Sequence, residues 1–240
     1  LIAHGFNKSR LPNRKEWQQI ALYGLLNITI YLGLYVIAMQ SVTAGIGSLA
    51  IATNPIFIIF LSVFFLNKKM TWDIVLALII CTIGVIIAAW PLFADAEVTT
   101  AGLLILLLSM VSYSIGAIYF TAKEWNGLSL LTINGWQTLL GGLFLLPFTL
   151  FFYDDTANQF SHVFWSSIIW LAIPVSIIAV QLWLWLLQTN AVRAGLWLFL
   201  CPLFGYIFAA WWMKDDISTY TVVGVVFVIV GLLLSKLNTR

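Results

Sequence analysis

Four polar side chains recur at every fourth residue of an otherwise apolar stretch near the start of the chain: Tyr23, Asn27, Tyr31 and Tyr35. In a helix this spacing places them on one slowly drifting face. Their chemistry is neutral hydrogen bonding, because phenols and amides donate and accept without ionising near pH 7. Any one of them could simply bond a neighbouring helix. Four polar tips facing lipid would be costly, so the row as a whole predicts the wall of a polar cavity.

Further polar groups lie in other apolar stretches. Ser109, Ser112, Tyr113 and Gly116 share a helix face and suit either a cavity wall or a close helix contact. Gln181 is the deepest polar residue of its stretch and the best candidate to contact a ligand. These residue types predict a site that binds by neutral hydrogen bonds.

Other polar and aromatic residues are expected to have structural roles. Asn134, Gln137 and Thr138 lie close to the end of their stretch. Most of the 12 tryptophans fall near the ends of apolar runs, as in an interfacial belt. Only Trp185 and Trp197 are expected to face the path. The predicted substrate path is lined by Asn27, Tyr31, Tyr35, Asn54, Ser112, Tyr113, Gln181, Trp185 and Trp197.

Pro55 and Pro202 each lie inside an apolar stretch. A proline in a helix interior removes one hydrogen bond and crowds the preceding turn. The carbonyl groups that it frees need other partners in lipid, and Asn54 could supply one. The two prolines are predicted to be hinges for alternating access, the other interpretation being packing kinks inherited by duplication.

The sequence contains no motif that predicts an enzyme. His4 and His162 are far apart, and no His, Asp or Glu cluster has metal-binding spacing. There is no nucleotide-binding loop, so neither a metal nor a cofactor is predicted. Glu16, Asp73 and Glu124 are expected at helix ends, where water would hydrate them, so no proton-coupling site is evident.

The composition requires most of the chain to lie in a membrane. It is 62% hydrophobic and 8% charged, against about 45–50% and about 25% in soluble domains. Polar residues gather between apolar runs of about twenty residues, the length that crosses ~30 Å of hydrocarbon. The sequence predicts an all-α integral membrane protein. Eight spans are expected, at 17–38, 43–66, 72–91, 101–122, 129–152, 163–188, 191–213 and 217–236.

Lysine and arginine set the expected orientation, because they concentrate in cytoplasmic loops. If the N-terminal segment is cytoplasmic and successive spans cross the membrane in alternating directions, all but one of the 11 Lys and Arg residues are cytoplasmic. Only Lys214 falls outside, and the outer loops "FADAEVTT" and "YDDTANQFSH" carry neither residue type. Both chain ends are therefore predicted to be cytoplasmic.

A repeat relates the two parts of the chain. With a shift of 147 residues Pro55 meets Pro202, and Lys68 meets Asp215. The change of charge indicates that the second copy is inverted in the membrane. An inverted tandem repeat needs an odd number of spans in each copy, and the later copy has five. We therefore expect ten spans in two inverted five-helix repeats, with residues 1–95 holding the last three helices of a truncated first repeat and 96–240 the second.

Two stretches carry a family resemblance: "QSVTAGIGSLAIATNPIFIIFLSVFFLNKKMTWDIVLALIICTIGVII" and "TNAVRAGLWLFLCPLFGYIFAAWWMKDDISTYTVVGVVFVIVGLLL". They resemble the EamA-type permeases of the drug/metabolite transporter superfamily. The resemblance implies a secondary transporter, an exporter or facilitator of small metabolites, in a bacterial inner membrane. Its substrate path would run between the two halves.

Amino acids are the leading substrate expectation from the resemblance. The alternatives are an efflux carrier for hydrophobic drugs or lipid-linked substrates, and a membrane subunit that transports nothing. The deep polar row favours transport. The expected partners are a small-molecule substrate and the lipid bilayer, without nucleic acid, and a homodimer is compatible with the sequence.

Overall fold

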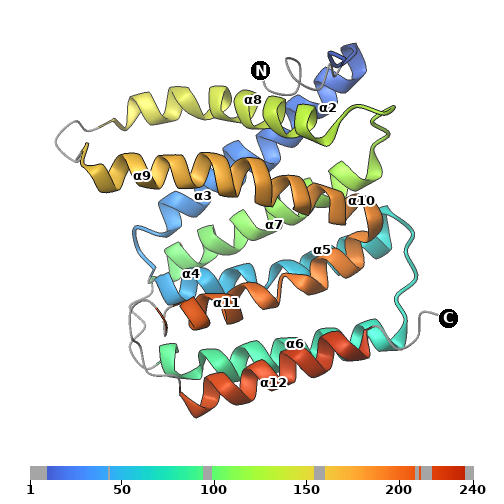
Figure 1. Cartoon of the computed structure of the whole chain (residues 1–240), viewed down its shortest axis with the longest axis vertical. Helices are drawn as coiled ribbons and strands as arrows, with labels where there is room; N and C mark the ends of the chain where they lie inside the picture. The colour runs from blue at the N-terminus through green and yellow to red at the C-terminus, as the bar shows by residue number, and fades with distance from the viewer. Residues whose placement is uncertain are drawn as a thin grey trace.

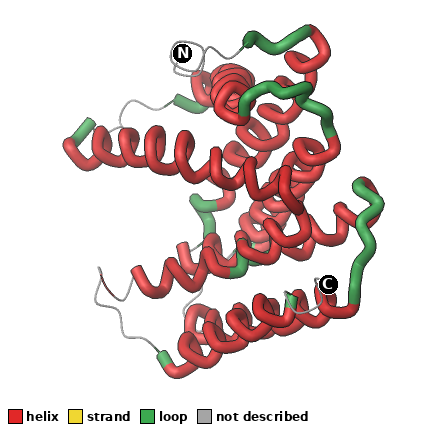
Figure 2. Tube along the Cα trace, turned by 45° about the vertical axis from the view of Figure 1, so that its right-hand side comes forward, coloured by secondary structure: helices red, strands yellow, loops and turns green. Residues whose placement is uncertain are grey.

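The computed structural model describes residues 10–42, 44–93, 99–153, 160–208, 211 and 218–235, and the elements described are helical (Figures 1 and 2). In chain order they are α2 (Arg14–Gly24), η1 (Leu25–Ile30), α3 (Tyr31–Ala38), α4 (Ala44–Ile51), α5 (Asn54–Phe65), α6 (Trp72–Ala89), η2 (Trp90–Phe93), α7 (Thr100–Ala122), α8 (Leu130–Phe151), α9 (His162–Trp170), η4 (Leu171–Ala179), α10 (Val180–Trp197), α11 (Leu200–Phe208) and α12 (Thr219–Leu234). The segments η1 and η4 are π-helical and η2 is a 3₁₀-helix.

The outside of the bundle is apolar. Large hydrophobic side chains such as Phe65, Phe151 and Ile169 are exposed, whereas a soluble monomer rarely exposes large contiguous apolar patches. Six helical stretches are long and apolar enough to cross a membrane: Arg14–Ala38, Ile46–Phe65, Trp72–Ala89, Thr100–Ala122, Leu130–Phe151 and His162–Trp197. The chain is therefore an all-helical multi-pass membrane protein, as its composition predicts.

Serine and threonine side chains define where four of the helices begin. Thr99, Ser129, Ser161 and Ser218 each accept a hydrogen bond from the backbone N–H three residues further on. Each bond satisfies one of the donors that the first turn of a helix leaves open. As a result α7, α8, α9 and α12 begin within two residues of the predicted spans.

Two predicted spans are interrupted. The span 43–66 consists of α4 and α5, and Pro55 lies in the first turn of α5. The span 191–213, as far as it is described, is broken in the same way between α10 and α11, and Pro202 is the third residue of α11. A proline is tolerated in the first helical turn because its missing N–H needs no partner there. Each proline therefore opens a new helix instead of kinking a continuous one.

Asn190 divides α10 at the boundary predicted between its two spans. Its dihedral angles are extended, with φ −164° and ψ 103°. Its side-chain oxygen accepts a hydrogen bond of 3.1 Å from the N–H of Arg193. An asparagine in this conformation caps the start of a new helix, so the residues after Asn190 form a separate helical segment that leads to α11.

Helices α6 and α12 pack side by side in opposite directions (Figures 1 and 2). Gly84 lies so close to α12 that a Cβ atom added to it would be 2.8 Å from the carbonyl oxygen of Gly224. At the other end of the contact, a Cβ on Gly231 would be 3.1 Å from the carbonyl oxygen of Ala77. Small residues permit this backbone approach, on which helix association in membranes depends.

The contact between α6 and α12 agrees with the 147-residue shift between the two copies of the repeat. Gly84 and Ala77 correspond to Gly231 and Gly224, so the two glycine contacts exchange their partners under the shift. Between them, the Cys81 thiol donates a hydrogen bond of 3.5 Å to the carbonyl oxygen of its own counterpart, Val228. An exchange of partners around one central pair is the pattern expected of an inverted repeat.

A second close contact joins α2 to α8. A Cβ atom on Gly24 would lie 2.5 Å from the carbonyl oxygen of Gln137. A Cβ atom on Gly141 would lie 2.6 Å from the carbonyl oxygen of Gly24. Together with α7 and α10, these helices surround a core that contains Tyr23 and Phe120.

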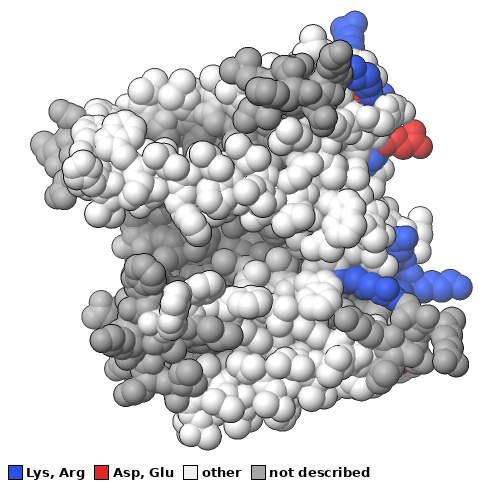
Figure 3. Space-filling model, viewed as in Figure 1, with Lys and Arg blue, Asp and Glu red and all other residues white. Residues whose placement is uncertain are grey.

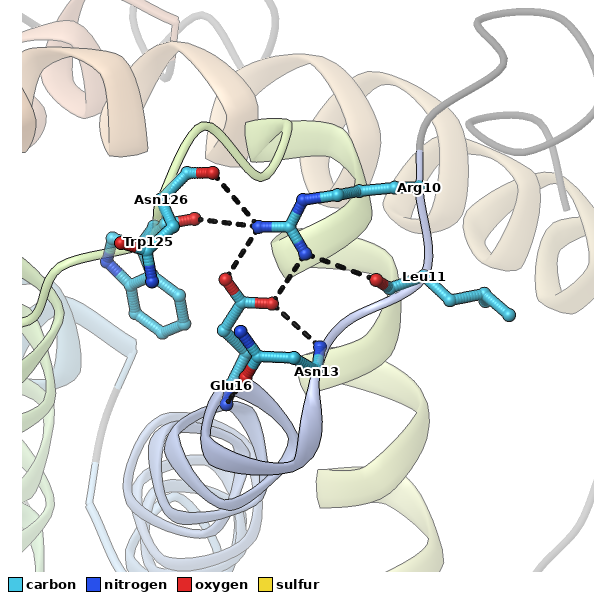
Figure 4. A network of polar contacts seen from close by, with 6 residues as sticks. All are labelled: Arg10, Leu11, Asn13, Glu16, Trp125 and Asn126. Carbon is cyan, nitrogen blue, oxygen red and sulfur yellow. Dashed lines mark hydrogen bonds and ion pairs between the residues drawn. The ribbon is translucent and has the colours of Figure 1, made fainter.

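Arg10 fastens the start of α2 to the loop between α7 and α8 (Figure 4). Its guanidinium group donates hydrogen bonds of 2.7 and 2.6 Å to the two carboxylate oxygens of Glu16. It also donates to the carbonyl oxygens of Trp125 and Asn126, at 3.5 and 3.0 Å. The bonds to Glu16 raise the pKa of Arg10 above its usual value, so the guanidinium stays charged. We call this group of four residues the Arg10 clasp.

The position of Glu16 differs from the hydrated one expected from the sequence. Its side chain is only 1% exposed. Besides Arg10 it accepts a hydrogen bond of 2.8 Å from the N–H of Asn13, whose own side chain caps α2. Such a capping box satisfies two donors at a helix start. The carboxylate is therefore paired and buried, and no sequence pattern predicts this because its partner Arg10 precedes the first span.

Replacing Gly84 by alanine should destabilise the α6–α12 pair. The new methyl group would meet backbone and side-chain atoms of α12 at 2.8–3.0 Å, and overpacking of this kind costs about 1–3 kcal/mol. Thermal unfolding in detergent, followed by tryptophan fluorescence, measures the loss. Gly142→Ala in α8 is the matched control, because nothing lies within 4 Å of its added Cβ. Equal unfolding temperatures for the two variants would contradict the proposed close contact.

Removing the Arg10 clasp should also lower stability. Arg10→Ala leaves the carboxylate of Glu16 without its cation and without two of its hydrogen bonds, so the unfolding temperature should fall. The same unfolding assay measures the change. In the double variant Arg10→Ala with Glu16→Gln no charge is left unpaired, so much of the lost stability should return. Strictly additive effects in this double-mutant cycle would show that the two side chains are not coupled.

Candidate functional site

An aromatic cluster occupies the middle of the bundle. The rings of Tyr31 on α3 and Tyr113 on α7 have centroids 4.8 Å apart, and Tyr35 lies 6.1 Å from Tyr31. On the other side of Tyr113, the indole of Trp183 on α10 stacks at 6.1 Å. The cluster thus joins three of the predicted path residues, and it brings together helices from both halves of the chain.

An exposed thiol lies near this cluster. Cys201 of α11 is near enough to interact electrostatically with the phenols of Tyr31 and Tyr113, yet it is an exposed residue. Figure 3 shows the surface hollowed between the α9–α10 region and α11, away from the edge where Lys and Arg gather. The aromatic cluster, with Cys201 near it, is the candidate site.

A chain of amide groups supports the site from one side. Asn27 in η1 donates a hydrogen bond of 3.4 Å to Gln137 on α8, and Gln137 donates one of 3.2 Å to Asn134. Asn134 in turn donates one of 2.6 Å to the backbone carbonyl oxygen of Ser176 in η4. The chain links two π-helical segments through α8. The structural role expected for Asn134 and Gln137 agrees with these bonds, and Asn27 shares that role.

Two more predicted path residues are held by hydrogen bonds to neighbouring helices. The hydroxyl of Ser112 donates to the carbonyl oxygen of Leu26 at 2.8 Å. The side-chain oxygen of Asn54 accepts a hydrogen bond of 3.3 Å from the hydroxyl of Ser114. In lipid such bonds satisfy groups that water cannot reach. Both residues are buried beside the cluster, and these bonds give them a structural function there.

Two of the described amides, Gln19 of α2 and Gln181 of α10, have a side-chain oxygen that is shielded from solvent without a hydrogen-bond partner in the described part of the chain. Of the two, Gln181 is the predicted path residue and lies on the helix that carries Trp183. Gln181 lies one turn before Leu184, which is fully buried, so it borders the inward face of α10. A buried polar atom without a partner costs about 1–3 kcal/mol. Its amide is the polar group of the site most in need of an external ligand.

The tryptophans are distributed differently from the sequence expectation. Trp183, expected in the interfacial belt, is partly buried and belongs to the aromatic cluster. Trp185 and Trp197 are 58% and 40% exposed, so their part in the path stays a prediction. In the structure Trp183 precedes the buried Leu187 by one turn, whereas Trp185 lies on the face of the exposed Leu182. Both leucines look alike in the sequence, so no sequence signal separates the two tryptophans.

Pro55 and Pro202 flank the site as the first-turn residues of α5 and α11. Both are buried, and the backbone of Pro55 lies 3.8 Å from a Cβ atom built on Gly195 of α10. A break in the helix precedes each proline, so backbone hydrogen bonding is interrupted at corresponding places in both halves. A hinge function for the prolines stays a prediction that this geometry makes reasonable.

The chemistry available at the site is binding without ionisation. Phenols, an indole, amides and one thiol line it, and they offer hydrogen bonds and aromatic faces. Among the described residues, no three His, Cys, Asp or Glu side chains gather as a metal site would require. The arrangement can recognise a small molecule that carries polar groups and an apolar part.

Comparisons with known proteins give the chain its family. The sequence model of the EamA-like transporter family matches residues 1–90 and 100–237. Protein PecM of Dickeya dadantii is 27% identical over 222 residues, which cover 91% of this chain and 73% of that protein. A probable terminal-alkyne amino-acid exporter of Streptantibioticus cattleyicolor is 29% identical over 150 residues, 61% of this chain and 48% of that protein.

A solved structure shares the fold. It is the crystal structure of a protein 15% identical in sequence, and it superposes with a TM-score of 0.79 over 98% of this chain and 80% of its own. The family match covers almost every residue of the chain and agrees with the resemblance seen in the two repeated stretches. The chain belongs to the EamA-like transporter family, whose members move small molecules across membranes.

Proposed function

We propose that this protein is a secondary transporter that carries small metabolites, with amino acids as the leading class, across a bacterial inner membrane. The observation that carries the proposal is the neutral aromatic cluster that joins α3, α7 and α10, together with the unpartnered amide of Gln181 on α10. Amino acids fit such a site through hydrogen bonds to their polar groups and contact with the rings. One relative is named as a probable amino-acid exporter, which supports the class.

The transport mechanism that we propose is alternating access in a pair of inverted five-helix repeats. The family model matches the chain twice, over 1–90 and 100–237. The glycine contacts of α6 and α12 exchange partners under the 147-residue shift, and helix breaks precede Pro55 and Pro202 in the two copies. Inverted repeats place the substrate site between them and open it to each side in turn.

We further propose that the end of the bundle rich in Lys and Arg is cytoplasmic and that this end is closed. The described Lys and Arg residues gather along one edge in Figure 3. Positive charge favours the cytoplasmic side. The Arg10 clasp and the core around Tyr23 and Phe120 seal α2, α7 and α8 together. The hollow lies away from the basic edge, so the conformation would face outward.

Transport by reconstituted protein tests the site. Liposomes that contain the protein should exchange at least one amino acid of a radiolabelled panel with an internal pool. Gln181→Ala should reduce exchange by about 2- to 10-fold, the effect of one lost hydrogen bond. Gln188→Ala, two turns along the same helix and exposed, is the matched control and should leave the rate unchanged. No movement of any amino acid would refute the substrate class, and equal loss in both variants would refute the role of Gln181.

Thiol labelling tests the hollow and the orientation without a known substrate. Cys201 is exposed and Cys81 is buried, and the chain contains 2 cysteines. A charged, membrane-impermeant methanethiosulfonate reagent added to intact cells should modify Cys201 and spare Cys81. Transported amino acids should slow the reaction. If only a permeant reagent modified Cys201, the hollow would not be open to the outer side, and Cys201→Ser provides the background signal.

A further inference from the structure

A basic pocket lies at the end of the bundle where Lys and Arg gather, apart from the aromatic cluster. Its volume is about 180 Å³. Three cationic side chains, Lys68, Lys69 and Arg193, line it together with a single acidic one, Asp73. The remaining lining residues are Thr71, Ile74, Asn190, Val192, Leu196 and Ser235.

The cations come from separate parts of the chain. Lys68 and Lys69 belong to the loop between α5 and α6, and Arg193 follows the break in α10. The backbone N–H of Lys68 donates a hydrogen bond of 3.3 Å to the carbonyl oxygen of Ser62, which ties the loop to the end of α5. The backbone N–H of Arg193 donates to the side chain of Asn190. The fold thus brings three cationic residues to one concavity.

The pocket carries an excess of positive charge. Three cationic side chains against one carboxylate, that of Asp73, leave a net charge of +2 (3 − 1) on its described lining, even where Asp73 pairs with one of the cations. Like charges held close together repel one another, and the repulsion falls when an anion binds between them. Arginine and lysine together are suited to phosphate, which accepts several hydrogen bonds and carries the opposite charge.

We propose that this pocket binds the phosphate group of an anionic ligand, either the headgroup of an anionic phospholipid or a soluble phosphate. The apolar side chains of Ile74, Val192 and Leu196 give one wall that can contact the glycerol and acyl part of a lipid. Basic pockets between helices at the cytoplasmic face bind lipid headgroups in this manner. A bound phosphate would link the α5–α6 loop to the break in α10, beside the segment that leads to α11.

The second copy of the repeat lacks the corresponding lysines, so the basic pocket is a feature of one copy and not of both. At the positions 147 residues after Lys68 and Lys69, the sequence has Asp215 and Asp216. Both lie outside the described residues. An acidic pair there would repel phosphate, so the sequence favours phosphate binding at one end of the transporter only.

The test measures ligand-induced stabilisation of the purified chain in detergent. Thermal unfolding is followed by tryptophan fluorescence during titration with phosphatidylglycerol, with phosphatidylcholine as the neutral lipid, and separately with inorganic phosphate against chloride at constant ionic strength. The pocket variant is Lys68→Gln, Lys69→Gln and Arg193→Gln together. The matched control removes three cations from the same end, by Arg14→Gln, Lys15→Gln and Lys123→Gln.

The wild type and the control should be stabilised equally, and half-saturation of the pocket variant should need at least about tenfold more ligand. Stabilisation by phosphatidylglycerol alone would assign the site to lipid, and stabilisation by inorganic phosphate as well would assign it to soluble phosphate. If the pocket variant does not fold, Lys68→Arg with Lys69→Arg should keep binding, while Arg193→Gln alone should weaken it. Equal weakening in pocket and control variants, or no stabilisation of the wild type, would overturn the proposal. Transport activity does not enter the measurement, so its outcome is independent of the proposed function.

Discussion

The absence of hydrogen-bond partners in lipid is the constraint on which this structure depends. Polar side chains within the spans bond mainly to backbone carbonyl groups inside the protein. Ser62 donates to Ile58, and Thr29 donates to Gly141 across two helices. Once these bonds are made, few polar atoms are left to contact a ligand. The unpartnered oxygen of Gln181 is therefore more informative about function than the number of polar residues in the helices.

The same constraint explains where the chain can be irregular. Breaks before α5 and α11 and the π-helical segments η1 and η4 expose backbone groups that regular helices would satisfy. They are compensated locally, as when the Thr53 hydroxyl donates to the carbonyl oxygen of Ala50 and when Asn134 donates to the carbonyl oxygen of Ser176. Irregular backbone at membrane depth is tolerated only where protein or a cavity surrounds it. Its concentration around the aromatic cluster is consistent with a site that rearranges.

Periodicity and composition predict the helices well and the site only in part. Span boundaries follow from apolar run length and from caps such as Ser129, both of which are local. The place of Trp183 in the aromatic cluster shows the limit, because the inner and outer faces of a membrane helix are similarly apolar and two residues along the helix point to nearly opposite faces. The burial of Glu16 depends on Arg10 and on a loop more than 100 residues away. Such contacts exist only in the folded bundle and produce no periodic pattern in the sequence.

The close helix contacts restrict how access could alternate. Gly84 with Gly224 joins α6 of the first half to α12 of the second, and Gly24 with Gly141 joins α2 to α8. Since both contacts cross from one proposed repeat to the other, the repeats cannot rock past each other as two separate bodies without separating backbone that is in contact. The Arg10 clasp also joins the α7–α8 loop to the pair formed by α2 and α8. Any alternation of access in this fold must therefore keep α6 with α12 and α2 with α8 in contact.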